Sequence, residues 1–279
     1  MQVARTIAAL RATVSEWKNR GQKISVIPTM GALHEAHLAL VRAANSHAER
    51  RIVTIFVNPT QFNDASDLAN YPRRESDDAA LIENEGVDLL FAPDPGEMYS
   101  DGYSTTITVK RVSEGMCGAF RPGHFDGVAT VVAKLFNQTQ ADVAFFGEKD
   151  YQQLHVVRRM VRDLDFPITI IGHPTVRETD GLAMSSRNAR MTPAERAIAP
   201  KLSETLFRAA SEIAQGRPVP EAVQAARHAL ANSGFASPEY LEFRSEKDLC
   251  PLDAPSEPAR LLAAVFLGKV RLIDNVRVP

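Results

Sequence analysis

Short apolar runs rich in β-branched residues alternate with helical patterns through the first 171 residues of the chain. Five of these runs have the length and composition of buried strands, at residues 24–27, 52–57, 87–92, 143–146 and 168–171. Strand patterns that alternate with helical patterns are typical of β-α units whose strands lie parallel in one sheet. We therefore predict an α/β fold in which helices cover a parallel sheet.

Three local patterns add detail to this prediction. Apolar residues from Val3 to Trp17 recur at helical spacing and predict an amphipathic opening helix. Pro28 is expected to end the first strand, because proline has no N–H to donate to a strand ladder. Residues 103–109 alternate in a strand-like way, which predicts a further strand.

The pattern changes near Pro174. Residues 175–188 are polar and irregular, and Asp180-Gly181 within them is a turn signal. Two helical patterns and then three short strand patterns follow, at about 193–215, 220–233, 240–243, 261–267 and 270–276. We predict two domains, residues 1–175 with the parallel sheet and residues 176–279 as a smaller α+β domain.

The composition limits the partner and the compartment. Lys plus Arg total 32 and Asp plus Glu total 34, so bulk charge gives no support for a nucleic-acid partner. Cys117 and Cys250 lie far apart, which offers neither metal spacing nor a disulfide framework and fits a reducing compartment. The first residues lack the pattern of a signal peptide, and no apolar run approaches membrane-spanning length. We predict a cytoplasmic protein with no membrane partner.

His34 and His37 lie three residues apart where the first strand gives way to a helix. Gly31 permits a tight turn before them. The first turn of a helix presents backbone N–H groups and the positive end of the dipole, so two imidazoles there favour a phosphate. Two other interpretations stay open: two ordinary helix histidines, and a zinc site, although zinc proteases space their histidines at i and i+4.

Two later segments also suit phosphate. Gly147-Glu148-Lys149-Asp150 follows a strand, where Lys149 could hold a phosphate and Asp150 a ribose hydroxyl. The alternative is a polar turn with a helix-capping aspartate. Residues 184–187 (Met-Ser-Ser-Arg) offer two hydroxyls and a guanidinium, and the alternative is a surface loop with turn-forming serines.

Further polar residues have weaker signals. Gln61 and Gln153 could orient a small polar substrate, although a lone glutamine is usually only solvated. Asp77 and Asp78 could help to hold magnesium on phosphates, or could be acids favoured at the start of a helix. The chain has no dinucleotide-binding glycine fingerprint, no P-loop and no nucleophile elbow.

Taken together, these segments resemble the pantothenate synthetase family of nucleotidyl transferases. The resemblance rests on six blocks in the order of that family, at residues 28–38, 56–62, 71–73, 121–125, 146–153 and 180–188. It implies a Rossmann-like domain with a smaller C-terminal lid domain, as a homodimer. It also implies ATP-dependent condensation of pantoate with β-alanine through pantoyl adenylate, with AMP and pyrophosphate released, in the presence of Mg²⁺.

The resemblance also assigns roles to individual residues. It implies catalytic roles for His34, His37, Lys149, Ser185 and Arg187, and substrate binding by Gln61 and Gln153. It names no metal-binding residue, so the protein ligands of Mg²⁺ stay open. The implied ATP-binding residues are Met30, Gly31, Ala32, Leu33, His34, Glu35, Ala36, His37, Gly147, Glu148, Lys149, Asp150, Val176, Met184, Ser185, Ser186 and Arg187.

One residue departs from the family pattern. Ala36 stands where the family has glycine, at a point where the nucleotide lies close to the helix backbone. We expect ATP to be tolerated there, with reduced affinity. Three alternatives stay open: a related nucleotidyl transferase with another acceptor, a zinc hydrolase that uses His34 and His37, and a non-enzymatic nucleotide sensor that has lost turnover.

Overall fold

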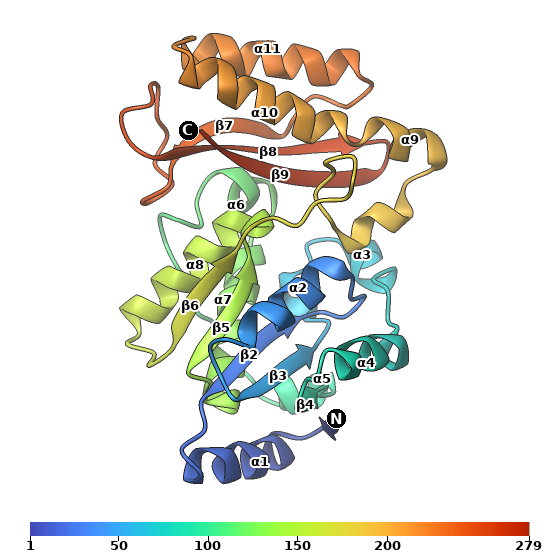
Figure 1. The fold of residues 1–279 in the computed structure, drawn as a ribbon, viewed down its shortest axis with the longest axis vertical. Helices are drawn as coiled ribbons and strands as arrows, with labels where there is room; N and C mark the ends of the chain where they lie inside the picture. The colour runs from blue at the N-terminus through green and yellow to red at the C-terminus, as the bar shows by residue number, and fades with distance from the viewer. Residues whose placement is uncertain (279) are drawn as a thin grey trace. The chain divides into compact units, whose positions relative to one another are not determined.

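A six-stranded sheet forms the first part of the fold (Figure 1), in a computed structural model that describes residues 1–278. The strand order is β1-β4-β3-β2-β5-β6, and every neighbouring pair is parallel. The strands are β1 (Gln2–Ala4), β2 (Ile24–Thr29), β3 (Arg50–Ile55), β4 (Leu89–Phe91), β5 (Val143–Gly147) and β6 (Thr169–His173). The predicted α/β class with a parallel sheet is confirmed.

Helices connect these strands and bury the apolar residues of the sheet. Phe145 of β5 and Ile27 of β2 pack in one core cluster with Leu38 and Val41 of α2. The connecting elements are α1 (Ile7–Asn19), α2 (Glu35–Ala44), η1 (Pro59–Gln61), α3 (Ala65–Ala69), α4 (Glu75–Asn84), α5 (Pro95–Met98), α7 (His124–Thr139), η2 (Glu148–Asp150) and α8 (Tyr151–Asp163).

The order of the strands reverses at β2. From β2 the chain goes to β3 and then β4 on one side, and later to β5 and β6 on the other side. In an open parallel sheet, ligands bind outside the carboxyl ends of the strands at such a reversal. The topology therefore favours the loops after β2, β3 and β5 as the place of a site.

Two predictions about the first residues and strand are wrong. Val3 lies in β1 and is 47% exposed, so it is not part of the opening helix, which begins at Ile7. Pro28 does not end β2, which continues to Thr29. Successive residues of a strand point their backbone N–H and C=O groups to opposite neighbours. The Thr29 carbonyl accepts from the backbone N–H of Phe56, the residue after β3, so Thr29 faces β3. Pro28 therefore faces β5, where pairing has already ended at Val26, so its missing N–H removes no ladder bond.

Two further elements differ from prediction. Residues 103–109 form no strand. A bond from the Ile107 N–H to the Thr130 hydroxyl ties this segment to α7 instead. The single helix expected at 193–215 is two helices, α9 (Pro193–Ile198) and α10 (Lys201–Ala214), because Pro200 interrupts the helical ladder.

A three-stranded antiparallel sheet forms the second part of the fold. Its order is β7 (Tyr240–Ser245), β8 (Ala259–Leu267), β9 (Val270–Val278). Helices α10 and α11 (Val219–Asn232) lie against one face of this sheet (Figure 1) and share its apolar core, which includes Leu206 and Leu261. The short elements η3 (Ser186–Arg190) and α6 (Met116–Phe120) complete this part.

The chain divides into two units by its internal packing. Unit 1 comprises residues 1–113, 121–148 and 153–174, and unit 2 comprises residues 114–120, 149–152 and 175–279. The division into domains at residue 175 that we predict from the sequence stays a prediction.

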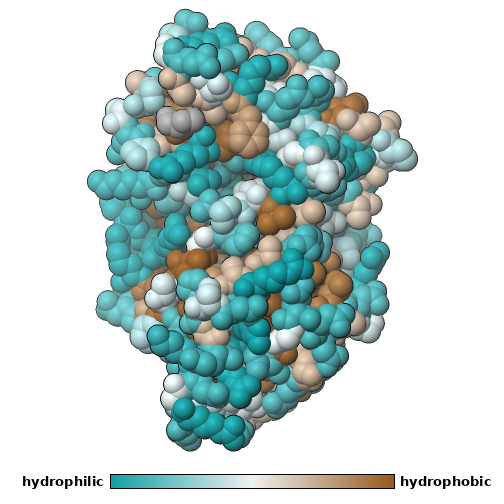
Figure 2. Space-filling model, in the orientation of Figure 1, coloured by the Kyte–Doolittle hydropathy of each residue, from teal (hydrophilic) through white to brown (hydrophobic). Residues whose placement is uncertain are grey.

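The surface is mostly hydrophilic on the face seen in Figure 2, with apolar residues in separated groups. The large apolar side chains that are exposed come from distant points of the sequence: Val3, Leu81, Phe120, Leu164 and Phe207. Within residues 1–278, no helix combines the length and the apolar character needed to cross a membrane.

Candidate active site

Three polar segments follow neighbouring strands of the parallel sheet. Met30 comes directly after β2, Asn58 lies three residues after β3, and Gly147 is the last residue of β5. Because β2 pairs with both β3 and β5, the carboxyl ends of these strands meet at one edge of the sheet. Met30, Asn58 and Gly147, all of unit 1, therefore lie at the strand reversal.

The turn after β2 is held by a buried carboxylate. Gly31 has φ 82° and Ala32 has φ 51°, both in the left-handed region. The Asp78 oxygens accept the backbone N–H groups of Ala32 and Leu33, each at 2.8 Å. A Cβ on Gly31 would lie 3.0 Å from Asp78 Oδ2. Glycine at this position therefore permits both the left-handed backbone angle and the close approach of the carboxylate.

Asp78 is 2% exposed and sits in the first turns of α4. Burial raises the pKa of its carboxyl, while the bonds from the Leu33 and Ala32 N–H groups act in the opposite direction. Both of its oxygens are bonded to the turn. The structure thus gives Asp78 a role beyond the two we considered from the sequence, because it fixes the start of the segment predicted to bind ATP.

The two histidines lie at the start of α2, as predicted. His34 is the N-cap residue and His37 is the third helical residue. The His34 backbone N–H donates to His37 Nδ1 at 3.3 Å, and the ring centroids are 4.3 Å apart. Because the accepting Nδ1 carries no proton, the ring proton of His37 sits on Nε2. His37 therefore has a donor nitrogen of defined position at a helix N-terminus.

Gln61 contacts the turn after β2 directly. Its Nε2 donates to Met30 Sδ at 3.1 Å, and its Oε1 accepts from Asn58 Nδ2 at 3.0 Å. Gln61 is 8% exposed. The structure thus brings together a residue predicted to bind substrate and a residue predicted to bind ATP.

Asn58 is completely buried and orients Gln61. Its Oδ1 accepts from the Tyr99 hydroxyl at 2.8 Å, and its Nδ2 also donates to the Gly127 carbonyl at 3.1 Å. Burial raises the pKa of Tyr99, which keeps the phenol protonated as a donor. The amide of Asn58 is therefore fixed in one orientation, and this orientation presents its nitrogen to Gln61.

The backbone at Gln61 is held by residues at the start of α7 and just before it. The Gln61 carbonyl contacts His124 Nδ1 at 2.8 Å and accepts from Arg121 Nη2 at 3.3 Å. A Cβ on Gly127 would lie 2.5 Å from the Thr60 carbonyl oxygen, so η1 packs against the bare backbone of α7. No sequence pattern predicts a role for Asn58, Tyr99, His124 or Gly127. All but Tyr99 lie in or beside the 56–62 and 121–125 blocks of the family resemblance.

Gly147, Glu148 and Gln153 belong to unit 1, and the Lys149-Asp150 pair belongs to unit 2. Lys149 Nζ lies 3.6 Å from Asp150 Oδ2, and the Lys149 carbonyl accepts from Asn275 Nδ2 at 3.0 Å. All of these residues are partly exposed except Asn275, which is buried. The backbone at Lys149 is therefore fixed while its amine stays accessible.

The remaining predicted residues lie on one hairpin of unit 2. The Met184 N–H donates to the Val176 carbonyl at 3.0 Å, and Asp180-Gly181 forms the turn at the far end. The Ser185 hydroxyl accepts from the Arg187 N–H at 3.2 Å, which begins η3. The structure thus places Val176, Met184, Ser185, Ser186 and Arg187 together at the open end of this hairpin.

Comparison with known proteins relates this arrangement to one family. Residues 2–277 match the family model described as pantoate-beta-alanine ligase. The chain belongs to the pantoate–β-alanine ligase family. A pantothenate synthetase of Chelativorans sp. (strain BNC1) is 59% identical to this ligase, with 99% of this chain and 97% of the relative covered.

Solved structures agree with the family. A pantothenate synthetase from Thermus thermophilus has a TM-score of 0.94 at 45% identity, covering 100% of this chain and 99% of the other. A pantoate-beta-alanine ligase from Francisella tularensis, complexed with beta-gamma ATP and beta-alanine, has a TM-score of 0.83 at 34% identity. The match covers 99% of this chain and 97% of the other. The resemblance and the enzyme class that we predict from the sequence are confirmed.

The donor groups of this ligase suit a magnesium ion carried on phosphates. Among residues 1–278 no three His, Cys, Asp or Glu side chains cluster as a metal cage. Mg²⁺ commonly takes one or two carboxylates together with phosphate oxygens and waters, which does not require such a cage. Asp78 is committed to the 31–33 turn, whereas its neighbour Asp77 is exposed. Of the two carboxylates, Asp77 is therefore the one that is exposed to solvent.

Proposed function

We propose that this ligase condenses (R)-pantoate with β-alanine to give pantothenate, with ATP split to AMP and pyrophosphate. The family match over residues 2–277 supports the overall reaction. The observation that carries the assignment to this site is the contact of Gln61 Nε2 with Met30 Sδ at 3.1 Å. If Gln61 holds pantoate and Met30 lies along ATP, that contact sets the pantoate carboxylate beside the α-phosphate.

The first step forms pantoyl adenylate. A pantoate carboxylate oxygen attacks the α-phosphorus, the bond from that phosphorus to the bridging oxygen breaks, and pyrophosphate leaves. The carboxylate needs no base, but two anions must meet, so the step depends on electrostatic stabilisation. We assign this role to His34, His37, Lys149, Ser185, Ser186 and Arg187, with His37 acting through Nε2–H.

The second step forms the amide. The amine of β-alanine attacks the acyl carbon of pantoyl adenylate, the bond from that carbon to the AMP oxygen breaks, and the amine nitrogen gives up a proton. Gln61 and Gln153 would hold the pantoyl group through both steps. Gln61 suits this role because Asn58 fixes its amide and α7 fixes its backbone. Positioning of this kind supplies much of the rate in reactions between bound partners.

The other predicted residues would line the nucleotide. One group belongs to the turn that Asp78 fixes and to the start of α2: Met30, Gly31, Ala32, Leu33, Glu35 and Ala36. Main-chain N–H groups at the N-terminus of a helix suit phosphate oxygens. Residues Gly147, Glu148, Asp150, Val176 and Met184 are assigned to the nucleoside.

Several wider features belong to the same proposal. Bound Mg²⁺ would neutralise phosphate charge, with the exposed Asp77 as one candidate carboxylate. We also propose a homodimer in the cytoplasm, and residues 176–279 as a separate lid domain. These features rest on the family resemblance and the composition.

The reaction is tested by following AMP and pyrophosphate with purified protein, ATP and Mg²⁺. Both products should require pantoate, and without β-alanine about one equivalent of pyrophosphate per site should form. Omitting pantoate is the matched control. AMP formation that ignores pantoate would contradict the assignment, and ATP binding without turnover would favour a nucleotide sensor instead.

A further inference from the structure

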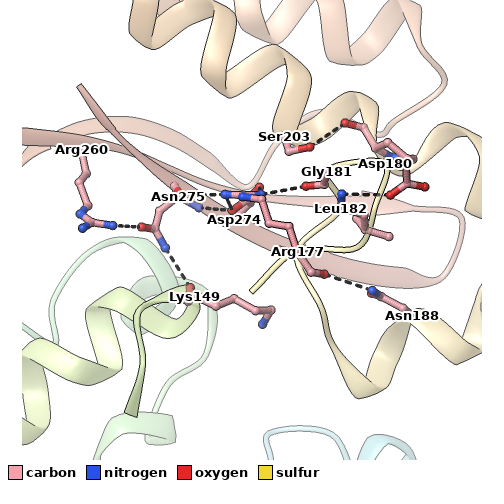
Figure 3. Close-up of polar contacts among 12 residues, drawn as sticks. Lys149, Arg177, Asp180, Gly181, Leu182, Asn188, Ser203, Arg260, Asp274 and Asn275 are labelled. Carbon is pink, nitrogen blue, oxygen red and sulfur yellow. Dashed lines mark hydrogen bonds and ion pairs between the residues drawn. The ribbon is translucent and has the colours of Figure 1, made fainter. Parts of the chain in front are cut away.

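Two adjacent residues of β9 reach two different segments of the proposed ATP site (Figure 3). Asp274 binds the Arg177 side chain at the base of the 176–187 hairpin, and Asn275 binds the Lys149 carbonyl. Both residues are 3% exposed. Neither belongs to a segment that the sequence patterns marked as functional, and all of the residues involved lie in unit 2.

A strand is suited to this arrangement because successive side chains point to opposite faces. Leu272 and Val276, two positions either side of Asp274, belong to the core covered by α10 and α11. Asp274 therefore lies on the helix-covered face of the sheet, and Asn275 lies on the other face. Two consecutive residues of one paired strand can thus hold two segments at a fixed separation.

Asn275 uses its whole amide. Its Nδ2 donates to the Lys149 carbonyl at 3.0 Å, and its Oδ1 accepts from Arg260 Nη1 at 2.7 Å. Arg260 in turn lies over the ring of Tyr151, with Cζ 4.1 Å from the centroid. Residues 149–151 are therefore held at two points by β8 and β9. The Lys149 side chain itself extends away from Asn275 (Figure 3).

Asp274 forms a two-pronged ion pair with Arg177. Its Oδ2 accepts from Nη1 at 2.7 Å and its Oδ1 accepts from Nη2 at 2.9 Å. Arg177 Nη1 also donates to the Gly181 carbonyl at 3.0 Å, which ties the turn of the hairpin to the same pair. The carboxylate is buried and the guanidinium is partly exposed. Such a pair adds little net stability over apolar residues of equal volume, so its value lies in the geometry it imposes.

We propose that Asp274 and Asn275 are positioning residues for the adenylation step, acting through the Ser185–Arg187 segment and through Lys149 respectively. This inference rests on the phosphate-binding roles proposed above for Lys149, Ser185 and Arg187. Neither residue touches substrate in this proposal. Each sets the backbone from which a cationic or hydroxyl group reaches the phosphates.

The Asn275 half is tested with Asn275→Asp. The change keeps an oxygen for Arg260 and removes the donor to Lys149, so single-turnover pyrophosphate release should slow by about 10- to 100-fold. The KM for pantoate should not change, because the contacts of Gln61 to Met30 and Asn58 are untouched. Ser245→Ala is the matched control, since it deletes a buried hydroxyl of the same sheet that accepts from the Lys247 N–H.

A double-mutant cycle with Lys149→Ala separates positioning from general damage. If Asn275 acts through Lys149, Asn275→Asp should slow the Lys149→Ala protein by less than about twofold. Additive losses, or a normal rate for Asn275→Asp, would overturn this inference and leave the proposed function intact. A normal rate for Lys149→Ala would instead overturn the phosphate role of Lys149, and the inference with it.

The Asp274 half is tested by removing the whole pair in Arg177→Met with Asp274→Leu. Replacement of both partners should leave the Tm near that of the wild type. Adenylation should slow about tenfold or more, and the loss should not add to that of Arg187→Ala. Arg177→Lys, which keeps the charge but not the two-pronged geometry, should be slow as well. Normal rates in both proteins would overturn this half.

Discussion

The Asp78 carboxylate accepts the Leu33 backbone N–H at 2.8 Å across 45 positions of sequence. Leu33 ends the turn after β2, and Asp78 lies on α4, which follows β3. The turn that precedes the two histidines is therefore set from a neighbouring β-α unit. The shape of this turn depends on tertiary structure as well as on Gly31.

We expect Asp78→Asn to lower the free energy of unfolding by about 1–3 kcal/mol, because one backbone N–H of the turn would face an amide NH₂ instead of an oxygen. The KM for ATP should rise as the turn loosens. Urea unfolding and steady-state kinetics measure the two effects. Asp77→Asn is the matched control and should change stability by less than about 0.5 kcal/mol. A stable Asp78→Asn protein with normal KM would contradict the anchoring role.

We expect His37→Ala to slow adenylate formation by about 10²- to 10³-fold, the usual effect of removing one donor to developing charge. The His34 N–H bonded to Nδ1 would also lose its partner. Single-turnover quench experiments with ATP and pantoate measure the rate. His47→Ala on the exposed region after α2 serves as the control and should behave as the wild type. A normal rate for His37→Ala would show that His37 lies outside the reaction.

Local patterns were enough to predict most of the fold. The strands β2 to β6 and helices such as α11 have apolar periodicities that their own sequence determines. The errors arose where distant segments decide the outcome. Pro28 is tolerated because the pairing of β2 with β5 has already ended at Val26, and the 103–109 segment is bonded to α7 through Ile107 and Thr130. Neither fact can be read from the residues themselves.

The site shows the same division. His34, His37, Gln61 and Lys149 stand in motifs that resemble a family, so they could be proposed from sequence. Tyr99, Asp274 and Asn275 act through residues that are distant in the sequence. Tyr99 bonds Asn58 across 41 positions, Asp274 bonds Arg177 across 97 positions, and Asn275 bonds Lys149 across 126 positions. Residues that orient others in this way carry no local signal, because only the fold brings their partners to them.

The ion pair of Arg5 with Glu75 should make a pH-dependent contribution to the stability of the fold. Arg5 Nη1 donates to Glu75 Oε2 at 2.8 Å, and this bond lowers the pKa of Glu75 below its ordinary value of 4.5. A lowered carboxyl pKa stabilises the fold above the unfolded value, and the effect is lost as pH falls through the folded value. Wild type should therefore exceed Arg5→Met in stability at neutral pH, and the difference should shrink below about pH 4.5.

Unfolding by urea at a series of pH values measures this difference. Arg11→Met on the exposed side of α1 provides the control, since it should show the same pH dependence as the wild type. A gap between wild type and Arg5→Met that stays constant down to about pH 3 would contradict the assignment.

Gly127→Ala should impair pantoate binding without touching a proposed substrate contact. The added Cβ would lie 2.5 Å from the Thr60 carbonyl and 2.7 Å from the Gln61 nitrogen, so η1 must move. Because the Gln61 amide depends on that position, the KM for pantoate should rise by about tenfold or more. Ala129→Gly, a matched change on the same helix, should lower stability by about 1 kcal/mol with no effect on KM. A normal KM for Gly127→Ala would show that η1 can shift without consequence.

Ala36 is the second residue of α2 and stands where the family pattern has glycine. Ala36→Gly should tighten the binding of a non-hydrolysable ATP analogue if the methyl group intrudes on the nucleotide. It should also lower the free energy of unfolding by up to about 1 kcal/mol, since glycine is the poorer helix former. Ala39→Gly on the same helix shares the stability loss and should leave affinity unchanged. Calorimetric titration of the three proteins separates the two effects, and equal dissociation constants would show that the methyl group does not limit ATP binding.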